Sequence, residues 1–303
     1  MKDYPITHRK VQANGIELHL AESGDAIAPL LILLHGFPEF WFAWRDYMSS
    51  LAASGFHVVA PDQRGYNLSE KPRGIDAYEL GVLADDIAGL ASALGRETFQ
   101  IVGHDWGGSV AWSIASRHPS RLERMVVLNA PHPAIWLRAM RTDPDQRRKS
   151  GYVRFLQLPW LPEVLLRLGG YQALAKAFAS ACPEAFTVDV MQTYRDAWRT
   201  PGALTAMLNW YRAILRRPMP IPAVGALSTP CLILWGDSDL FGIPKLADDS
   251  AALCAEAEAI HLPGIGHWII HDAHETVLTH IQRFVVQPSR NGQTRKLVIG
   301  FME

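Results

Sequence analysis

Residues Phe99–Trp112, FQIVGHDWGGSVAW, decide the fold of this chain. The apolar run Phe99–Val102 predicts a buried strand, and the apolar residues after Gly107-Gly108 recur at helical spacing. Between them, Gly103-His104-Asp105-Trp106-Gly107 has the G-x-S-x-G pattern of a nucleophile elbow, with aspartate in place of serine. The flanking glycines let the strand and the helix pack closely around a strained residue. We therefore expect Asp105 to project from the carboxyl edge of a parallel sheet, where α/β sheets bind ligands.

An aspartate at this position implies a different reaction from that of a serine. A carboxylate is ionised at pH 7 and is suited to displacement at a saturated carbon that bears a leaving group. The product is an alkyl ester of Asp105, a covalent intermediate that water must then cleave. We therefore predict that Asp105 is a nucleophile, and not merely a structural residue of the turn.

Composition places the chain among ordinary globular proteins. It has 303 residues, of which 49% are hydrophobic and 19% charged, enough for one α/β domain with an insertion or for two domains. The net charge of -1 gives no electrostatic argument for binding nucleic acid or an anionic membrane, so we expect neither as a partner. The oligomeric state stays open, and a homodimer is compatible with the sequence.

The lack of a recognisable signal peptide or membrane span, together with the cysteine pattern, predicts a cytoplasmic protein. The N-terminal MKDYPITHRK lacks the apolar core of a signal peptide, and no apolar run approaches the roughly 20 residues of a membrane span. Cys182, Cys231 and Cys254 have no metal-site spacing, and their odd number does not suggest a disulfide framework.

Strand and helix patterns alternate along the first part of the chain and predict a mostly parallel sheet. Ile6–Ala13 and Ile16–Ala21, joined by Asn14-Gly15, predict a hairpin with a type I′ turn. The later predicted strands are short apolar runs at Leu30–Leu34, Val58–Ala60, Phe99–Val102, Met125–Leu128, Cys231–Trp235 and Ala259–Leu262.

The pattern changes between Pro131 and Pro218, where the periodicity is helical and prolines interrupt it. We expect an α/β core formed by residues 1–130 and 219–303, with residues 131–218 as a helical cap domain. Within the cap, Arg141–Lys149 is polar and predicts an exposed segment. The tail, residues 288–303, is polar with a short apolar run, Leu297–Phe301.

Candidate partners of Asp105 follow it in the chain order nucleophile, acid, histidine. His267 lies in a glycine-rich loop before the last predicted helix, where it can deprotonate water for attack on the ester. An acid is needed to hold the imidazole in the right tautomer. Asp237 and Asp239 both qualify by position. We choose Asp239, which lies further from the strand end, and regard Asp237 as a turn residue.

Backbone amides of Phe37 and Trp106 are the candidate oxyanion hole. Phe37 follows an early strand, and Trp106 follows the nucleophile, the two positions from which this kind of turn draws its donors. The neighbouring His35 and His104 are expected to support the turns by hydrogen bonds. His271, His274 and His280 are expected on a solvated face. The first two are weak evidence for zinc, and we expect no metal and no cofactor.

Five motifs together resemble the α/β-hydrolase-fold epoxide hydrolases, over nearly the whole chain. They are His35-Gly36-Phe37-Pro38-Glu39, Asp62-x-Arg64-Gly65-Tyr66, Gly103-His104-Asp105-Trp106-Gly107-Gly108, Trp235-Gly-x-x-Asp239 and Gly266-His267-Trp268. The resemblance implies an α/β-hydrolase fold, with helices flanking the sheet and a helical cap inserted after the sixth strand. Haloalkane and fluoroacetate dehalogenases share the aspartate nucleophile and the histidine.

The resemblance also implies that two cap tyrosines hydrogen-bond the epoxide oxygen. Tyr211, in LNWYR, and Tyr152, in SGYVRFLQ, match these positions, although Gly151 stands where the family often has an aromatic residue. A neutral phenol with a pKa of about 10 can donate to the alkoxide that forms when an epoxide opens. Dehalogenases instead pair a tryptophan with a second donor for the halide, and Phe37 is no such donor. The fluoroacetate enzymes have arginine after the nucleophile, where this chain has Trp106.

We therefore predict an epoxide hydrolase that forms a vicinal diol. Its catalytic residues are Asp105, His267, Asp239, Tyr152 and Tyr211. Phe37, Trp41, Trp106 and Phe155 are the candidate substrate-lining residues, and their aromatic side chains suggest an apolar epoxide. The alternatives are a haloalkane or haloacetate dehalogenase, and a non-catalytic binding protein on the same fold.

Overall fold

The computed structural model describes residues 4–287, which form one sheet covered by helices. The eight strands are β1 (Thr7–Ala13), β2 (Ile16–Ser23), β3 (Leu30–Leu34), β4 (His57–Pro61), β5 (Phe99–His104), β6 (Leu122–Leu128), β7 (Cys231–Gly236) and β8 (Ala257–Leu262). Their order in the sheet is β1-β2-β4-β3-β5-β6-β7-β8. The pairs β1–β2 and β2–β4 are antiparallel, and the other neighbours are parallel. The expected mostly parallel sheet is confirmed.

The N-terminal hairpin has the predicted turn. Asn14 and Gly15 both have positive φ, 47° and 76°, as a type I′ turn requires. This turn sets the register of β1 on β2, in which Ala13 pairs with Ile16.

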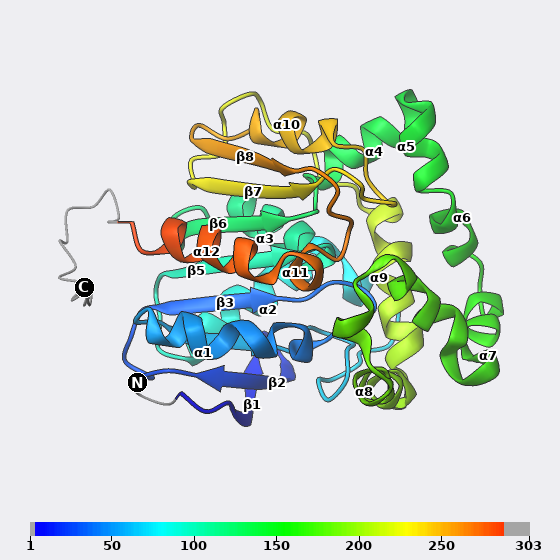
Figure 1. Ribbon diagram of the computed structural model, residues 1–303, viewed down its shortest axis with the longest axis horizontal. Helices are drawn as coiled ribbons and strands as arrows, with labels where there is room; N and C mark the ends of the chain where they lie inside the picture. The colour runs from blue at the N-terminus through cyan, green and yellow to red at the C-terminus, as the bar shows by residue number, and fades with distance from the viewer. Residues whose placement is uncertain (1–3, 288–303) are drawn as a thin grey trace.

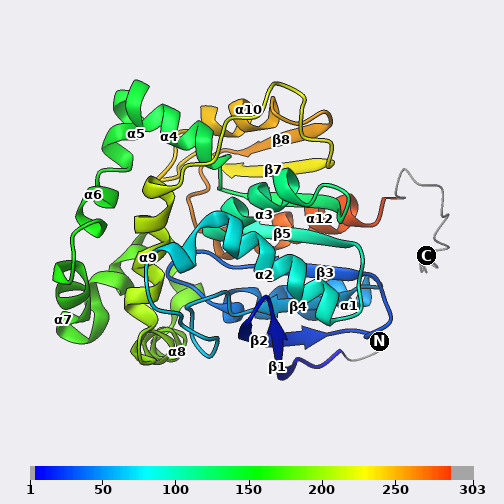
Figure 2. The ribbon, with the colours of Figure 1, turned by 180° about the vertical axis from the view of Figure 1, so that it is seen from behind.

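Alternate residues of the central strands enter two hydrophobic clusters, one on each face of the sheet. In β3, Leu31 and Leu33 face one cluster, whereas Ile32 and Leu34 face the other. The first face is covered by α1 (Arg45–Ala53), α11 (Ile269–Asp272) and α12 (His274–Val285), which lie in front of the sheet in Figure 1. The second face is covered by α2 (Leu80–Ala93) and α3 (Trp106–Arg117), seen in Figure 2. Burial on both faces explains the continuous apolar runs of these strands.

Between β6 and β7 the described chain contains no strand but, besides short 3-10 helices, six α-helices. They are α4 (Pro133–Thr142), α5 (Pro144–Lys149), α6 (Tyr152–Leu156), α7 (Leu161–Ala175), α8 (Val188–Arg199) and α9 (Ala203–Arg216). Figure 1 shows this group beyond the carboxyl ends of the strands, with α9 nearest the sheet and α5, α6 and α7 at the outer edge. We call these helices the cap.

The cap differs in detail from the expectation. The polar segment Arg141–Lys149 contains the end of α4 and all of α5, which Pro144 begins and the Asp143 side chain caps. Helix α7 consists of two parts, joined by a break at Leu168–Tyr171 where Gly169 and Gly170 have positive φ. A short 3-10 helix, η3 (Lys176–Ser180), completes the second.

The remaining connections are short, and the tail lies beyond the described part. Further 3-10 turns are η1 (Trp41–Trp44), η2 (Asp76–Tyr78) and η4 (Pro183–Phe186), and α10 (Lys245–Ala251) precedes β8. The tail with its apolar run Leu297–Phe301 lies outside the described residues. None of the helices within residues 4–287 is both long and apolar enough to cross a bilayer.

Candidate active site

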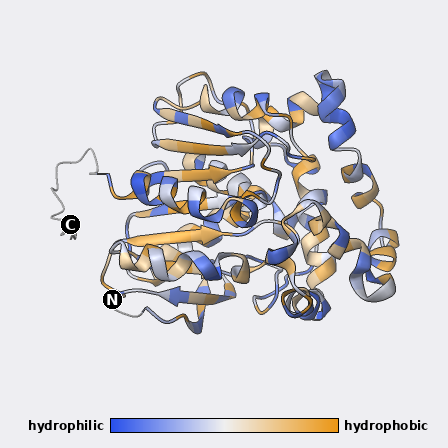
Figure 3. Cartoon of the chain, viewed as in Figure 1, coloured by the Kyte–Doolittle hydropathy of each residue, from blue (hydrophilic) through white to orange (hydrophobic). Residues whose placement is uncertain are grey.

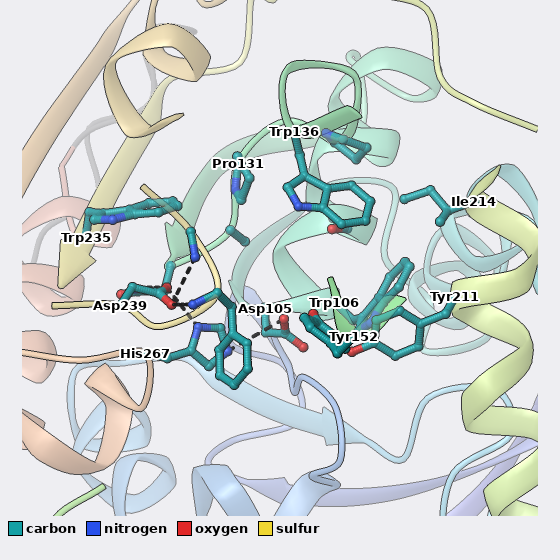
Figure 4. A pocket seen from close by; sticks show the side chains of 16 residues that line it. Asp105, Trp106, Pro131, Trp136, Tyr152, Tyr211, Ile214, Trp235, Asp239 and His267 are labelled. Atoms are coloured by element: carbon teal, nitrogen blue, oxygen red, sulfur yellow. Dashed lines mark hydrogen bonds and ion pairs between the residues drawn. The ribbon is translucent and has the colours of Figure 1, made fainter. Parts of the chain in front are cut away.

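Asp105 lies at the sharp turn between β5 and α3. Its φ is +51° and its ψ is −117°, the strained conformation expected of this elbow. An added Cβ on Gly103 would lie 2.5 Å from the Gly107 carbonyl oxygen, and one on Gly107 would lie 2.1 Å from the Leu34 carbonyl oxygen. Glycine is therefore required at both positions because the backbone segments touch there. The turn directs the Asp105 carboxylate toward the cap (Figure 4).

The structure brings Asp105, His267 and Asp239 together. His267 Nδ1 lies 2.9 Å from Oδ2 of Asp239, and its Nε2 lies 3.7 Å from Oδ2 of Asp105. Asp237 points elsewhere and pairs with His261 at 2.6 Å. The geometry thus distinguishes the two acids that the sequence left open.

Further donors hold the Asp239 carboxylate in place. The Asn129 side-chain amide donates to Oδ2 at 2.7 Å, and the Phe241 backbone N–H donates to Oδ1 at 2.6 Å. Burial alone raises the pKa of Asp239, but the His267 ring and these donors outweigh it, and the pKa is lowered. Asp239 is therefore ionised and able to fix the tautomer of His267.

His267 has a raised pKa. Burial lowers the pKa of the imidazole, but Asp239, with contributions from Asp105 and Glu39, outweighs this effect and raises it to about 9. His267 is consequently protonated at neutral pH while all three carboxylates keep their charges.

Two cap tyrosines lie close to Asp105. Tyr152 begins α6 and Tyr211 lies on α9, with ring centroids 5.9 Å apart. Tyr211 packs edge-on against Trp106 at 4.9 Å and Phe37 at 5.2 Å. Tyr152 is 37% exposed because it faces the cavity. Burial among the surrounding side chains, then the nearby Asp105 charge, raises the pKa of Tyr152, and burial likewise raises that of Tyr211. Both phenols are therefore neutral donors at pH 7.

The two oxyanion candidates flank the same carboxylate. The Phe37 N–H donates to Oδ1 of Asp105 at 2.8 Å. Trp106 is the first residue of α3, where a backbone N–H has no acceptor within the helix. The helix N-terminus also favours negative charge at this point.

Two cavities meet at the catalytic candidates. The larger measures about 580 Å³ and the smaller about 60 Å³, and both are lined by Asp105, Tyr152, Tyr211, Phe241 and His267. The larger is mostly apolar and includes Phe37 and Phe155, whereas Trp106 lines the smaller. Trp41 lines neither, because its ring packs against His8 and Phe40. The structure does not bring this expected lining residue to the site.

A buried cluster around Glu39 was not predicted from the sequence. Glu39 Oε1 accepts from Tyr194 at 3.0 Å and lies 2.7 Å from His271 Nε2, and His104 is within 3.3 Å of Oε2. The expected solvated position of His271 is wrong, since its side chain is only 5% exposed. Burial raises the pKa of Glu39, but His271 and His104 outweigh it and lower the pKa well below its usual range.

The histidines beside the two active loops act as expected. His35 bonds to the Gly36 carbonyl and accepts from the Gln63 N–H, while His104 Nε2 lies 2.9 Å from the His267 carbonyl oxygen. Residues 4–287 contain no group of three or more His, Cys, Asp or Glu side chains arranged to hold a metal ion.

Comparison with known proteins agrees with this geometry. A family model of the alpha/beta hydrolase fold matches residues 29–273. The chain is 44% identical to the AB hydrolase superfamily protein YfhM of Bacillus subtilis, over 86% of this chain and 92% of that protein. It is 38% identical to Epoxide hydrolase 3 of Mus musculus, over 86% of this chain and 71% of that one.

A solved structure resembles the whole described molecule. The crystal structure of an epoxide hydrolase of Bacillus megaterium in complex with an inhibitor superposes with a TM-score of 0.84 at 30% identity, covering 92% of this chain and all of the other. The chain therefore belongs to the epoxide hydrolases of the α/β-hydrolase family.

Proposed function

We propose that this protein converts an epoxide to a vicinal diol through an alkyl ester of Asp105. One observation carries the proposal. A carboxylate nucleophile lies at the meeting point of two cavities that are also lined by two neutral phenols and a histidine with an ionised partner. Such a site supplies a nucleophile, an acid for the leaving oxygen, and a base for water.

In the first step, Asp105 attacks one epoxide carbon and the carbon–oxygen bond to that carbon breaks. The Phe37 N–H holds Oδ1, which leaves Oδ2 as the attacking oxygen. The leaving oxygen stays on the substrate as an alkoxide, and Tyr152 and Tyr211 donate to it. A positioned acid of this kind contributes roughly 10²–10⁴-fold to a rate.

In the second step, water attacks the ester carbonyl. His267, oriented by Asp239, removes a proton from the water, and the amides of Phe37 and Trp106 stabilise the tetrahedral oxyanion. The ester bond then breaks, and the two protons of the water end on the two diol oxygens, one of them by way of His267. The diol leaves, and the Asp105 carboxylate and the starting protonation state of His267 are restored. Neither step calls for a metal or a cofactor.

The cavity supports an apolar substrate. Its lining includes Phe155, Leu166 and Leu174, and its volume of about 580 Å³ suits an aryl- or alkyl-substituted epoxide. We propose the cytoplasm as its compartment, on the grounds that Cys182, Cys231 and Cys254 are all free thiols.

A panel of epoxides and haloacids, assayed for diol and for halide, tests the function. We expect diol from styrene oxide and no halide from haloacetate. The changes Tyr152→Phe and Tyr211→Phe should each lower kcat for the epoxide by roughly 10²-fold. Tyr171→Phe is the matched control, since Tyr171 is a cap tyrosine that packs against Trp198 and should leave turnover unchanged.

The result that contradicts the proposal is equally specific. Halide release without diol would make the protein a dehalogenase. Binding of epoxide that survives Asp105→Asn, with no turnover in the unmodified protein, would favour a binding protein.

A further inference from the structure

The net charge of -1 conceals two oppositely charged regions. Residues 131–218 contain thirteen Lys and Arg against six Asp and Glu, a net charge of +7. The rest of the chain contains sixteen Lys and Arg against twenty-four Asp and Glu, a net charge of −8. The positive charge therefore belongs to the cap, on one side of the molecule (Figure 1). A protein is attracted to a charged surface by a local cluster of opposite charge, whatever the net charge of the whole chain.

The same region exposes a group of large apolar side chains. They are Leu158, Trp160, Val164, Leu165 and Leu168, which lie at and just before α7. Trp160 is 69% exposed and Leu168 is 59% exposed. Trp160 directly precedes α7, and Val164, Leu165 and Leu168 lie in its first part, up to the break at Leu168–Tyr171. We call this group the α7 face.

Three cations lie on or next to α7: Arg154 on α6, Arg167 on α7 and Lys176 just after it. Arg154, Arg167 and Lys176 are exposed, and none of the three forms an ion pair with a carboxylate within residues 4–287. Figure 3 shows hydrophilic residues on α5 and hydrophobic ones among those of α7, at the same outer edge of the molecule. Apolar side chains including a tryptophan, bordered by unpaired cations, form the pattern of a surface that lies in a membrane interface.

We propose that the α7 face docks the protein on the surface of a bilayer that contains anionic lipids. The apolar side chains would enter the interface, while the cations meet the negative headgroups. A second copy of the chain fits this face less well, because a two-fold contact places the same patch on both subunits. It would set Arg154, Arg167 and Lys176 near their own copies. The expectation from the sequence that an anionic membrane is not a partner was based on the net charge of the whole chain. That value combines the positive cap with the negative remainder and hides both.

Docking at this face would place the cavity beside the lipid. Helix α7 exposes Leu165 and Leu168, while Leu166 and Leu174 of the same helix line the large cavity. Lys176, at the end of α7, belongs to both the cation group and the cavity lining. An apolar epoxide dissolved in the bilayer could therefore enter the site without crossing bulk water. This consequence, unlike the docking itself, rests on the proposed function.

Co-sedimentation with vesicles tests the docking. The full chain is mixed with vesicles of phosphatidylcholine alone and with vesicles that also contain about one third phosphatidylglycerol. We expect binding to the anionic vesicles that weakens as salt is raised. The pair Arg154→Gln and Arg167→Gln should reduce the partition coefficient by about fivefold for each cation removed. Trp160→Ser with Leu165→Ser should reduce it at least as much.

Ile27→Ser is the matched control, because Ile27 is 83% exposed and lies outside residues 131–218, in the part of the chain with net negative charge. It should bind vesicles as the unmodified protein does. Every variant should keep its turnover of a water-soluble epoxide, which shows that it is folded. Equal sedimentation with both kinds of vesicle, or binding that the variants leave unchanged, overturns the docking.

A protein that stays in the supernatant and forms a dimer that Trp160→Ser dissociates would also overturn it, in favour of self-association. A protein that forms diol but does not bind vesicles contradicts only the docking proposal. Vesicle binding without diol formation removes only the proposed function.

Discussion

At the residue scale, the charge on His267 would link the two steps of the proposed mechanism. In the free protein, Asp105 is one of the carboxylates that raise the His267 pKa to about 9. When Asp105 becomes an ester, its negative charge disappears, so the pKa of His267 must fall. A histidine that is protonated during attack on the epoxide thereby becomes a better base for the water that follows. In the proposed mechanism, esterification of Asp105 would therefore make His267 a base only after the first step.

The first prediction concerns this pKa. Replacing Asp105 with Asn removes the charge as the ester does, and should lower the pKa of His267 from about 9. NMR titration of the imidazole measures it. Asp237→Asn is the control, because Asp237 pairs with His261 and should leave the His267 titration unchanged. An unchanged pKa in Asp105→Asn would contradict the proposed timing.

The second prediction is the effect of the same group on stability. The folded pKa of about 9 lies above the ordinary value of 6.5, so protonated His267 stabilises the fold fully below pH 6.5. This contribution is lost as the pH rises through 9. Its upper bound is on the order of 3 kcal/mol. Denaturant unfolding between pH 6 and 10 should show a smaller loss in His267→Gln than in the unmodified protein. If the free energy of unfolding falls equally with pH in both proteins, the loss of stability comes from other groups.

The third prediction concerns Glu39, the buried carboxylate between His104 and His271. Its lowered pKa stabilises the fold above the ordinary value of 4.5, and this contribution is lost as the pH falls. Glu39→Gln should reduce the free energy of unfolding at pH 7 by about 3 kcal/mol, because two buried histidines lose their partner. Glu17→Gln, at an exposed pair with Lys10, should cost under about 1 kcal/mol. If both substitutions lower the free energy of unfolding equally, the buried Glu39 cluster stabilises the fold no more than an exposed ion pair does.

At this scale, the residues that the sequence predicts and the structure brings together are those that stand in a local pattern. His267 and Asp105 could be chosen because glycines and strand ends surround them. Asn129, Glu39 and His271 could not, since their partners are 110, 155 and 232 residues away in the chain. A glutamate beside a proline gives no local sign that the fold will bury it against two histidines.

At the scale of elements, the elbow depends on the contact of one glycine with a neighbouring strand. Gly107, in the first turn of α3, lies against the end of β3, where an added Cβ would be 2.1 Å from the Leu34 carbonyl oxygen. That oxygen belongs to the backbone of a central strand, so moving it would disturb the sheet. The same strand leads into the loop that carries Phe37, so a shift here would also displace the amide that holds Asp105.

The fourth prediction follows from this contact. Gly107→Ala should destabilise the fold by more than about 3 kcal/mol and abolish turnover, as overpacking against backbone does at its most severe. Gly81→Ala is the matched control. It lies in helix α2, where the added Cβ meets only the flexible end of Arg117 at 3.3 Å, and helix propensity should stabilise it by roughly 0.5–1 kcal/mol. Thermal unfolding and an epoxide assay measure both effects.

Elements of the core could be predicted better than those of the cap, for a physical reason. Buried parallel strands such as β3 need apolar residues at every position, and that demand is visible in the sequence. Except for α9, the cap helices are largely exposed on one side, and α5 and α6 have only six and five residues. The break in α7 falls at Gly169–Gly170, where both residues have positive φ, and the glycine pair marks it in the sequence although helical periodicity does not.

At the scale of the whole molecule, buried aromatic donors join the cap to the core. Trp198 Nε1 donates to the Pro38 carbonyl oxygen at 2.6 Å, and Trp210 Nε1 donates to the Arg64 carbonyl oxygen at 3.1 Å. Tyr194 adds its bond to Glu39. Pro38 directly follows Phe37, so the loop that supplies the first oxyanion donor is itself held by a cap helix. The two parts of the molecule therefore position together the Phe37 amide, the proposed oxyanion donor.

The fifth prediction tests this link between cap and core. Trp198→Phe keeps the apolar ring but removes the N–H, which leaves the Pro38 carbonyl oxygen without this donor and should cost about 1–3 kcal/mol. Because the Phe37 amide stabilises charge that develops during turnover, kcat should fall more than KM rises. Trp160→Phe, at an exposed cap residue, should change neither. A loss of stability with unchanged kcat would show that Trp198 holds the cap in place without positioning the amide, and the coupling of cap and oxyanion donor would have to be given up.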